Sequence, residues 1–280
     1  MDVFQGAGSQ QRAFDASDEG SVVFASDHGK AKQYHVCADH DALHNFVFAQ
    51  PPEKRCFYEM VRADAPIKLY FDLDLKGGDV ARMDAIQHAL IAFVNLKLAT
   101  VHERVVGADD VLVLNSDGAG KASRHLIWPV YFENVAHVKA FVHHNVVPHF
   151  PDAVDKGVYT KNRCFRLFGN RKLGSDRVLK SGRSDGSEGT QRRLFDQALL
   201  TLPPPPETTL LRSDGVGAVV PKKAAHKRKR SSSCDAEAET APAIDASHEG
   251  KVTAWVTALI RQEEGVNDPR APERRGNTLN

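Results

Sequence analysis

Two aspartates, Asp72 and Asp74, lie two residues apart in a segment that alternates between apolar and polar residues, 67–75. As a strand, this segment places its odd-numbered apolar residues on one face and both carboxylates on the other. Two carboxylates on one face of a half-buried strand repel each other, and a divalent cation removes that repulsion. The pair therefore indicates a Mg²⁺ or Mn²⁺ site. The plain alternative is a charged edge strand that resists aggregation.

A second polar set follows at Lys121, Ser123 and His125, which share one face of a strand by the same alternation. An ammonium group, a hydroxyl and an imidazole on one face are suited to binding a triphosphate. The alternative is a polar strand face that carries an ordinary histidine.

A third segment begins at Asp155 and continues through many cations, among them Arg166 and Lys172. From residue 155 to residue 193 the chain has 11 Lys or Arg and 4 Asp or Glu. Asp155 is suited to complete a metal site, and the two cations are suited to neutralise phosphate charge. The alternative is a solvated basic loop with an exposed aspartate.

The pattern around these segments predicts the elements that must position them. Expected strands are 22–25, 33–37, 55–61, 67–75, 111–114, 121–132 and 164–168. Expected helices are 40–49, 83–104 and 134–146, the last of which is capped by Asn134. Turns at 76–78 and 116–120 separate the strands.

The chain has 280 residues, 41% of them hydrophobic and 26% charged, with a formal net charge of +1. This composition predicts a soluble globular protein of one or two domains, and bulk charge near zero leaves the class of partner open. The four cysteines are scattered, which predicts reduced thiols in an intracellular protein. No apolar run approaches the length of about 18 residues that a membrane span needs, so no membrane partner is expected. The mixed, acidic N-terminus is unlike a secretory leader.

We expect the folded core to end near residue 202, where the composition changes. Residues 203–250 are rich in proline, then basic and rich in serine, which predicts a disordered linker, and 265–280 are expected to be disordered as well. Residues 251–264 have the spacing of a short amphipathic helix. Its segment 251–262 is expected to dock either on the core or on a partner such as a single-strand-binding protein or a clamp. The basic stretch 222–230 is typical of a nuclear localisation signal and equally of a linker that binds nucleic acid.

Taken together and in this order, the three motifs resemble those of the archaeo-eukaryotic primase superfamily. They read Tyr-Phe-Asp-Leu-Asp at 70–74, Lys-x-Ser-x-His at 121–125, and Asp-x-Gly-Val-Tyr-Thr-Lys-Asn-Arg-x-Phe-Arg-Leu at 155–167. The third motif is similar to that of the eukaryotic primase-polymerases (PrimPol), and the similarity covers about 55–179. It implies an α+β fold, with an RRM-like catalytic sheet flanked by helices over about 54–202 and an N-terminal α/β unit over about 1–53.

The resemblance also implies roles for individual residues. The carboxylates that match the family's metal ligands, for two Mg²⁺ or Mn²⁺ ions, are Asp72, Asp74 and Asp155. The residues that match nucleotide-binding positions are Lys121, Ser123, His125, Arg166, Lys172 and Arg12. Ser123 is expected to donate a hydrogen bond, and Lys121, His125, Arg166 and Lys172 are expected to supply positive charge. Arg12 is matched through the short stretch 11–14 alone.

The chain departs from the family pattern at three places. Asp74 stands where the closest eukaryotic relatives have Glu, and Cys164 stands where they have Asn, near the nucleotide. Relatives that make primers carry a Cys/His zinc module after the core. The tail here has Cys234, His226 and His248, too few for a site with four ligands. We therefore predict no zinc in this chain, and primer extension rather than primer initiation.

The resemblance implies a DNA-directed nucleotidyltransferase, which extends a 3′-hydroxyl from a (d)NTP by two-metal catalysis. It further implies a role in replication-fork damage tolerance and translesion synthesis. The expected partners are a DNA template-primer and a (d)NTP. We expect a monomer in the nucleus, with the mitochondrion as the alternative location.

Two other classes of function stay open. The first is a non-catalytic, RRM-like module that binds single-stranded nucleic acid through aromatic residues on its sheet face. Tyr70 is the one aromatic residue on the carboxylate face of strand 67–75, and unneutralised aspartates repel phosphates, so this class is disfavoured. The second is a metal-dependent nuclease, which has no use for the set at 121–125.

Overall fold

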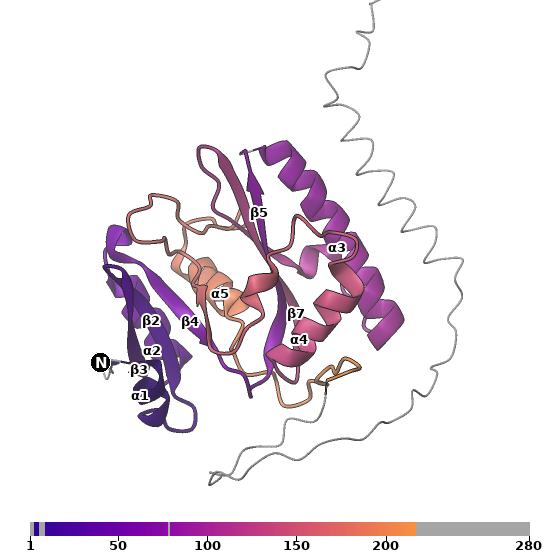
Figure 1. Ribbon diagram of the computed structural model, residues 1–280. Coiled ribbons are helices and arrows are strands. Elements are labelled where there is room, and N and C mark those ends of the chain that lie inside the picture. The colour runs from indigo at the N-terminus through magenta and orange to yellow at the C-terminus, as the bar shows by residue number, and fades with distance from the viewer. Residues whose placement is uncertain (1–2, 6–8, 78, 217–280) are drawn as a thin grey trace, which may run out of the picture. The chain divides into compact units, whose positions relative to one another are not determined.

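The computed structural model describes residues 3–5, 9–77 and 79–216 of the chain (Figure 1). These residues belong to one unit, Met1–Val216. The rest of the chain, Gly217–Asn280, lies outside the described residues. The predicted localisation signal at 222–230 and the predicted helix at 251–264 therefore also lie outside them.

Five strands of the described chain form an antiparallel sheet in the order β1–β3–β2–β4–β8. They are β1 (Val3–Gln5), β2 (Val22–His28), β3 (Ala31–Cys37), β4 (Phe57–Val61) and β8 (Arg163–Arg166). The turn between β2 and β3 begins at Gly29, whose φ of 60° is a conformation that glycine adopts readily. Strand β8 belongs to the third sequence motif, so this sheet joins that motif to the N-terminal part of the chain.

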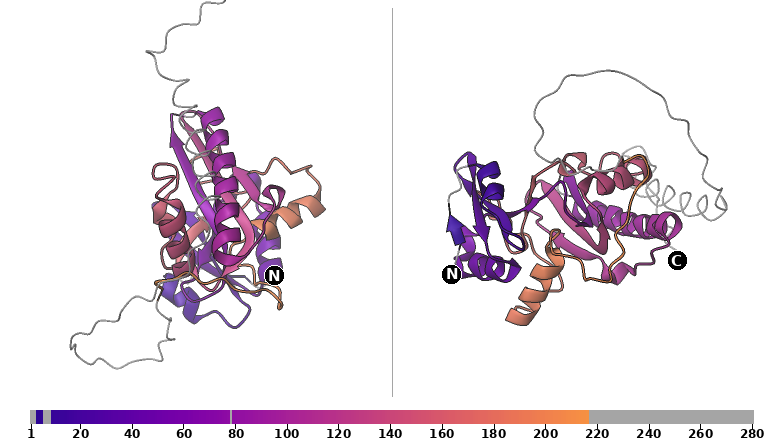
Figure 2. Two further views of the ribbon diagram at one scale, coloured as in Figure 1. Left: turned by 90° about the vertical axis from the view of Figure 1, so that its right-hand side faces the viewer. Right: turned by 90° about the horizontal axis from the view of Figure 1, so that it is seen from below.

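The other described strands form a second antiparallel sheet in the order β5–β7–β6. They are β5 (Ile67–Lys76), β7 (Lys121–Phe132) and β6 (Leu112–Asn115). Helices α3 (Val80–His102) and α4 (Val135–Phe141) cover the face of this sheet that lies away from the N-terminal strands (Figure 1, Figure 2). The opposite face carries the first two motifs.

The face under α3 is a packed apolar core. Phe71 of β5 and Trp128 of β7 are fully buried, with ring centroids 5.2 Å apart. The indole N–H of Trp128 donates to Oδ1 of Asn95 on α3 at 2.7 Å, so the one polar atom of this ring is satisfied. Burial of each large apolar side chain contributes about 1.5–3 kcal/mol, and this core therefore fixes strand β5 in its place.

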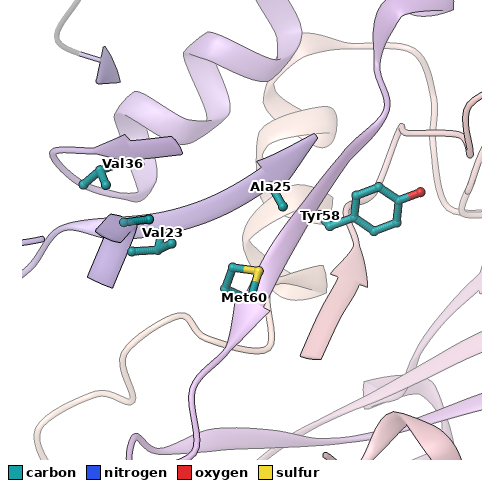
Figure 3. Close-up of a cluster of buried hydrophobic side chains, with 6 residues drawn as sticks. Val23, Ala25, Val36, Tyr58 and Met60 are labelled. Carbon is teal, nitrogen blue, oxygen red and sulfur yellow. The ribbon is translucent and has the colours of Figure 1, made fainter. Parts of the chain in front are cut away.

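A smaller apolar cluster lies on the N-terminal sheet (Figure 3). Its buried members come from α1 (Gln10–Asp15), β2, β3 and β4, and they are Ala13, Val23, Ala25, Val36, Tyr58 and Met60. The ring of Tyr58 belongs to the cluster, while its hydroxyl points away from the other labelled side chains and donates to Asp27 Oδ2 at 2.8 Å. Helix α2 (His40–Ala49) packs with Phe46 against Phe24 of β2, with ring centroids 5.4 Å apart.

Most predicted elements are confirmed, and the differences have local causes. Asn134 caps α4 by accepting a hydrogen bond from the N–H of Ala136 at 2.9 Å. The predicted helix over 134–146 is α-helical to Phe141 and then continues as a π-helical turn, Val142–Val146 (η3). Helices α1 and α5 (Glu188–Ala198) were not predicted, because α5 is mostly polar and α1 is short.

The protein is mixed α and β with antiparallel sheets, as predicted, but the RRM-like detail is not confirmed. An RRM sheet has four strands, whereas the sheet that carries the first two motifs has three strands among the described residues. The division expected near residue 53 also differs from the observed sheets, since β4 and β8 pair with the N-terminal strands.

The ordered chain continues past residue 202, where we expected a disordered linker to begin. In the segment 203–216, Leu211 is 7% exposed and bridges to Phe132 at the end of β7. The N–H of Leu211 donates to the carbonyl of Tyr131 at 2.9 Å, and its own carbonyl accepts from the N–H of Glu133 at 3.1 Å. Backbone hydrogen bonds and one buried leucine thus hold a segment whose composition has no apolar periodicity.

Two buried charges attach the C-terminal end of α5 to the sheets. Glu59 of β4 is 1% exposed and accepts hydrogen bonds from the N–H groups of Leu200 at 3.1 Å and Thr201 at 3.0 Å. Lys68 of β5 donates to two carbonyl oxygens in the last turn of α5, at 2.9 and 3.0 Å. Burial raises the pKa of Glu59 to about 7 and lowers the pKa of Lys68 to about 8. The attraction between these two groups partly offsets the cost of burying them.

The described cysteines, Cys37, Cys56 and Cys164, are free thiols, as predicted. Burial raises the pKa of Cys37 to about 12, which makes this thiol unreactive. None of the helices in the described part of the chain has the length and hydropathy needed to cross a bilayer.

Candidate active site

The pairing of β5 with β7 brings the first two sequence motifs together. In this register Asp72 lies opposite His125, and Asp74 lies opposite Ser123. Residues directly opposite each other in an antiparallel pair share a face, with Cβ atoms about 5 Å apart. The two motifs therefore form one polar surface, on the face of the sheet opposite the core under α3.

Asp155 reaches the same surface through its backbone. Leu73 forms an isolated antiparallel bridge with Val154, the N–H of Asp155 donates to the carbonyl of Asp72 at 2.9 Å, and the N–H of Asp74 donates to Ala153 at 3.4 Å. The stretch around Asp155 thus acts as a short extra strand beside β5. This pairing places the third carboxylate next to the first one across 83 positions of sequence, from 72 to 155.

The electrostatic centre of this surface is Asp72. Burial, together with the negative charges of Asp74 and Asp155, raises the pKa of Asp72 to about 7 against the attraction of Lys172 and Arg166. Oδ1 of Asp72 is buried and lacks a hydrogen-bond partner among the described residues. An unpaired buried carboxylate beside two others is the repulsive arrangement that the sequence predicted.

The other two carboxylates have protein partners. Oδ2 of Asp74 lies 2.7 Å from Nζ of Lys121, and Oδ1 of Asp155 accepts the N–H of Gly157 at 2.7 Å. In the described residues, no group of three or more His, Cys, Asp or Glu side chains is arranged so that it could hold a metal ion.

His125 is buried between the two sheets. Its ring lies against that of Phe165 on β8, with centroids 4.3 Å apart and the ring planes tilted by 32°, and its Nε2 lies 3.7 Å from Oδ1 of Asp72. Burial lowers the pKa of His125 well below its ordinary value, and the positive charges of Arg166 and Lys172 lower it further. The imidazole is therefore neutral, which differs from our expectation that it supplies positive charge.

Arg166 and Lys172 bring positive charge to this surface from the third motif. Arg166 is 8% exposed and donates from Nη2 to Oγ of Ser116 at 2.8 Å, while its Nε has no hydrogen-bond partner in the described chain. Burial lowers the pKa of Lys172, and the neighbouring charges of Arg166 and Lys121 lower it further. Three cations that repel one another form a site that an anion would stabilise.

These groups line a cleft of about 570 Å³. The predicted residues that line it are Asp72, Asp74, Ser123, His125, Arg166 and Lys172. The rest of its lining comes from α1, β3, β4 and the third motif, with Gln10, Lys32, Tyr34, Tyr58, Val158, Thr160, Lys161, Asn162, Arg163, Cys164 and Phe165. The cleft therefore lies between the two sheets, and its size is typical of a small-molecule site.

Some predicted residues lie outside this lining, and some lining residues were not predicted. Lys121 contacts the lining residue Asp74, and Asp155 is hydrogen-bonded to the lining residue Asp72. Arg12 is exposed on α1 and contributes no lining. Gln10, two residues before Arg12, does line the cleft and donates to the carbonyl of Asn162 at 3.0 Å. No sequence signal marks Gln10, because its position depends on the packing of α1 against the third motif.

Comparison with known proteins gives a distant similarity to a primase/polymerase. No protein-family model matches the chain. The chain is 27% identical, over 213 residues, to a DNA-directed primase/polymerase protein of Danio rerio. The match covers 58% of this chain and 38% of that protein, so the chain spans well under half the length of its relative. This similarity supports a relationship to primase-polymerases at a coarse level.

Proposed function

We propose that this protein is a DNA-directed nucleotidyltransferase that adds nucleotides from (d)NTPs to the 3′-hydroxyl of a primer. One observation carries the proposal: a carboxylate cluster and a cation cluster from separate parts of the chain meet in one cleft. Asp72 and Asp74 face this cleft together with Arg166 and Lys172, and the backbone joins Asp155 to Asp72. Nucleotidyl transfer needs both clusters, because negative charge builds up on the attacking oxygen and on the triphosphate. The similarity to a protein named as a primase/polymerase is consistent with this activity.

The residues present fit a divalent cation. Oδ1 of Asp72 is a buried oxygen without a hydrogen-bond partner in the described chain, and two further carboxylates lie beside it. Hard oxygen donors of this kind suit Mg²⁺ or Mn²⁺. Asp72, Asp74 and Asp155 would hold the ion, with Asp74 turning from Lys121. Such an ion supplies charge that stabilises the attacking and leaving oxygens.

The other residues of the cleft act on the nucleotide. Arg166 and Lys172 neutralise the charge of the triphosphate, and the hydroxyl of Ser123 donates a hydrogen bond to it. Lys121 joins them once Asp74 no longer holds its ammonium group at 2.7 Å. His125 is neutral, so it contributes a ring N–H as a hydrogen-bond donor and, through its ring contact with Phe165, fixes the spacing between the sheets.

The two competing functions are less well supported by the cleft. A module that binds single strands by stacking needs an accessible aromatic face, but Tyr70 is fully buried and its hydroxyl donates to the carbonyl of Val158 at 2.9 Å. A metal-dependent nuclease explains the carboxylates but has no need for the set Lys121, Ser123 and His125. A nucleoside triphosphate explains both sets of residues.

The sequence motifs support a more specific proposal for the superfamily, the reaction and the cellular role. We place the chain in the archaeo-eukaryotic primase superfamily, near the eukaryotic primase-polymerases, with an RRM-like origin for the β5–β7–β6 sheet. We propose primer extension rather than primer initiation, in the nucleus and in tolerance of damage at replication forks. A partner for the segment 251–262 and binding of template by the basic residues that follow Asp155 belong to the same proposal.

A single gel assay tests the proposal against both alternatives. A labelled primer annealed to a template is incubated with dNTPs and Mn²⁺ or Mg²⁺, and we expect the primer to lengthen. We expect the variant with Asp72→Ala and Asp74→Ala to leave the primer unchanged. Asp64→Ala is the matched control, because the Asp64 side chain is 65% exposed in the loop between β4 and β5. A primer that shortens indicates a nuclease, and a primer that is only bound indicates a binding module.

A further inference from the structure

The carboxylate of Asp27, near the end of β2, accepts three hydrogen bonds from separate parts of the chain. Its Oδ2 accepts the hydroxyl of Tyr58 at 2.8 Å and the backbone N–H of Leu173 at 3.0 Å. Its Oδ1 accepts Nζ of Lys32 at 2.5 Å. The side chain is 15% exposed, so these bonds are partly shielded from water.

The bond to Leu173 matters because Leu173 follows Lys172 directly. The backbone amides on both sides of Lys172 are fixed: the N–H of Arg171 donates to the carbonyl of Arg55 at 2.9 Å, and the N–H of Leu173 donates to Asp27. Lys172 itself lines the cleft. Asp27 and Arg55 thus determine where the chain presents this lysine.

Without such anchors the charges of the cleft oppose this position of Lys172. The positive charges of Arg166 and Lys121 repel its ammonium group more strongly than Asp72 and Asp74 attract it, and the side chain is exposed to solvent. This net repulsion favours a conformation in which the lysine swings out into solvent. A carboxylate that holds the next backbone amide resists that movement, because a hydrogen bond to a charged acceptor is stronger than one to a neutral acceptor.

Asp27 does not itself reach the substrate. It is absent from the residues that line the cleft, and its oxygens are occupied by Lys32, Tyr58 and Leu173. Burial opposes its negative charge, but the hydrogen bonds from Lys32 and Leu173 outweigh burial, and the pKa of Asp27 lies below its ordinary value. The carboxylate is therefore charged at neutral pH and remains a strong acceptor.

We propose that Asp27 is a positioning residue, which holds Lys172 in the cleft for the triphosphate of the incoming nucleotide through its bond to the Leu173 amide. This inference rests on the proposed function. It extends that function to a residue outside the sequence motifs, on the N-terminal sheet, and gives that sheet a role in nucleotide binding.

The test is a double-mutant cycle of Asp27→Ala and Lys172→Ala in primer extension, with dATP as the varied nucleotide on a template of dT. If Asp27 acts through Lys172, Asp27→Ala raises the KM for dATP about tenfold, which corresponds to about 1.4 kcal/mol, and leaves kcat within about twofold. In the Lys172→Ala background the same change adds less than about twofold. The Kd for the primer-template, measured by fluorescence anisotropy without nucleotide, is expected to stay unchanged, as is every parameter of Asp64→Ala.

Other results overturn the inference. If the increases in KM caused by Asp27→Ala and Lys172→Ala multiply in the double variant, Asp27 does not act through Lys172. A parallel loss of kcat, DNA affinity and thermal stability assigns Asp27 a structural role only. If Asp27→Ala does not fold, Asp27→Asn replaces it, since the amide keeps one acceptor oxygen and loses the charge, and the same lack of additivity is expected. A wild type that neither extends a primer nor binds dATP refutes the proposed function, whereas an active wild type with an additive cycle refutes the role of Asp27 alone.

Discussion

Replacing Asp72 with asparagine should make the metal-free protein more stable while it removes activity. The pKa of Asp72 rises from 3.8 to about 7 on folding, because burial and the charges of Asp74 and Asp155 disfavour its ionised form. Each pKa unit corresponds to about 1.4 kcal/mol, so the ionised group costs the folded state about 4 kcal/mol as an upper bound. One fifth of the side chain is exposed, and we halve the figure for solvent screening, to about 2 kcal/mol.

The sign of the pH dependence follows from the direction of the pKa shift. A group whose pKa is higher in the folded state gives up its proton first in the unfolded state. The protonated form of Asp72 therefore contributes stability that is fully present below about pH 4 and is lost as the pH rises through about 7. Asp72→Asn cannot ionise, so its advantage over the wild type should grow over this range and then level off.

The assay is thermal unfolding by circular dichroism in the presence of EDTA, at pH 4.5, 6 and 8. At pH 8 we expect Asp72→Asn to unfold about 4–8 °C above the wild type, since about 1 kcal/mol corresponds to about 2–4 °C in a protein of this size. At pH 4.5 the difference should be small. Asp64→Asn, in an exposed position, is expected to match the wild type at each pH. An advantage that does not change with pH, or a less stable Asp72→Asn at pH 8, would refute the reasoning.

Two further predictions concern the elements that hold the cleft in place. Lys68→Ala removes the cation that lies beside the buried Glu59 and bonds to the last turn of α5. It should lower the free energy of unfolding in urea by about 3–5 kcal/mol, and a loss below about 1 kcal/mol would show that water replaces the ammonium. Leu211→Ala should lower the same free energy by at least about 2 kcal/mol, because Leu211 is buried beside β7. Unchanged unfolding of Leu211→Ala would mean that the segment 203–216 is not part of the folded unit, and exposed Val105→Ala is the control.

The sequence predicted the faces of the motif strands better than their contacts. Alternation in 67–75 and 121–125 correctly placed Asp72 and Asp74 on one face and Ser123 and His125 on one face. It did not predict the register between β5 and β7, because α3 and β6 separate these strands in the chain and register depends on how they pack. Residue type suggested that Asp155 completes the metal site, but its pairing beside Asp72 was not predicted, since one isolated bridge between distant segments leaves no pattern in sequence.

The residues that the sequence did not identify share one property. Asp27 and Tyr58 bond to each other, and Asp27 bonds to Leu173, through contacts made only after the N-terminal sheet has formed. Each residue is ordinary in its local sequence, and its role depends on tertiary position. The neutral state of His125 has the same origin, because its burial depends on tertiary contacts, among them the ring contact with Phe165 of the other sheet.

The central claim is that three carboxylates from two distant segments form one active site, and Asp155 tests it most directly. Primer extension by Asp155→Asn is compared with extension by Asp152→Asn, which changes an exposed aspartate three residues earlier in the chain. Loss of a metal ligand removes several kcal/mol of transition-state stabilisation, so we expect Asp155→Asn to slow extension at least about 100-fold. Asp152→Asn is expected to extend primers at the wild-type rate. Extension by Asp155→Asn at the wild-type rate would contradict the account.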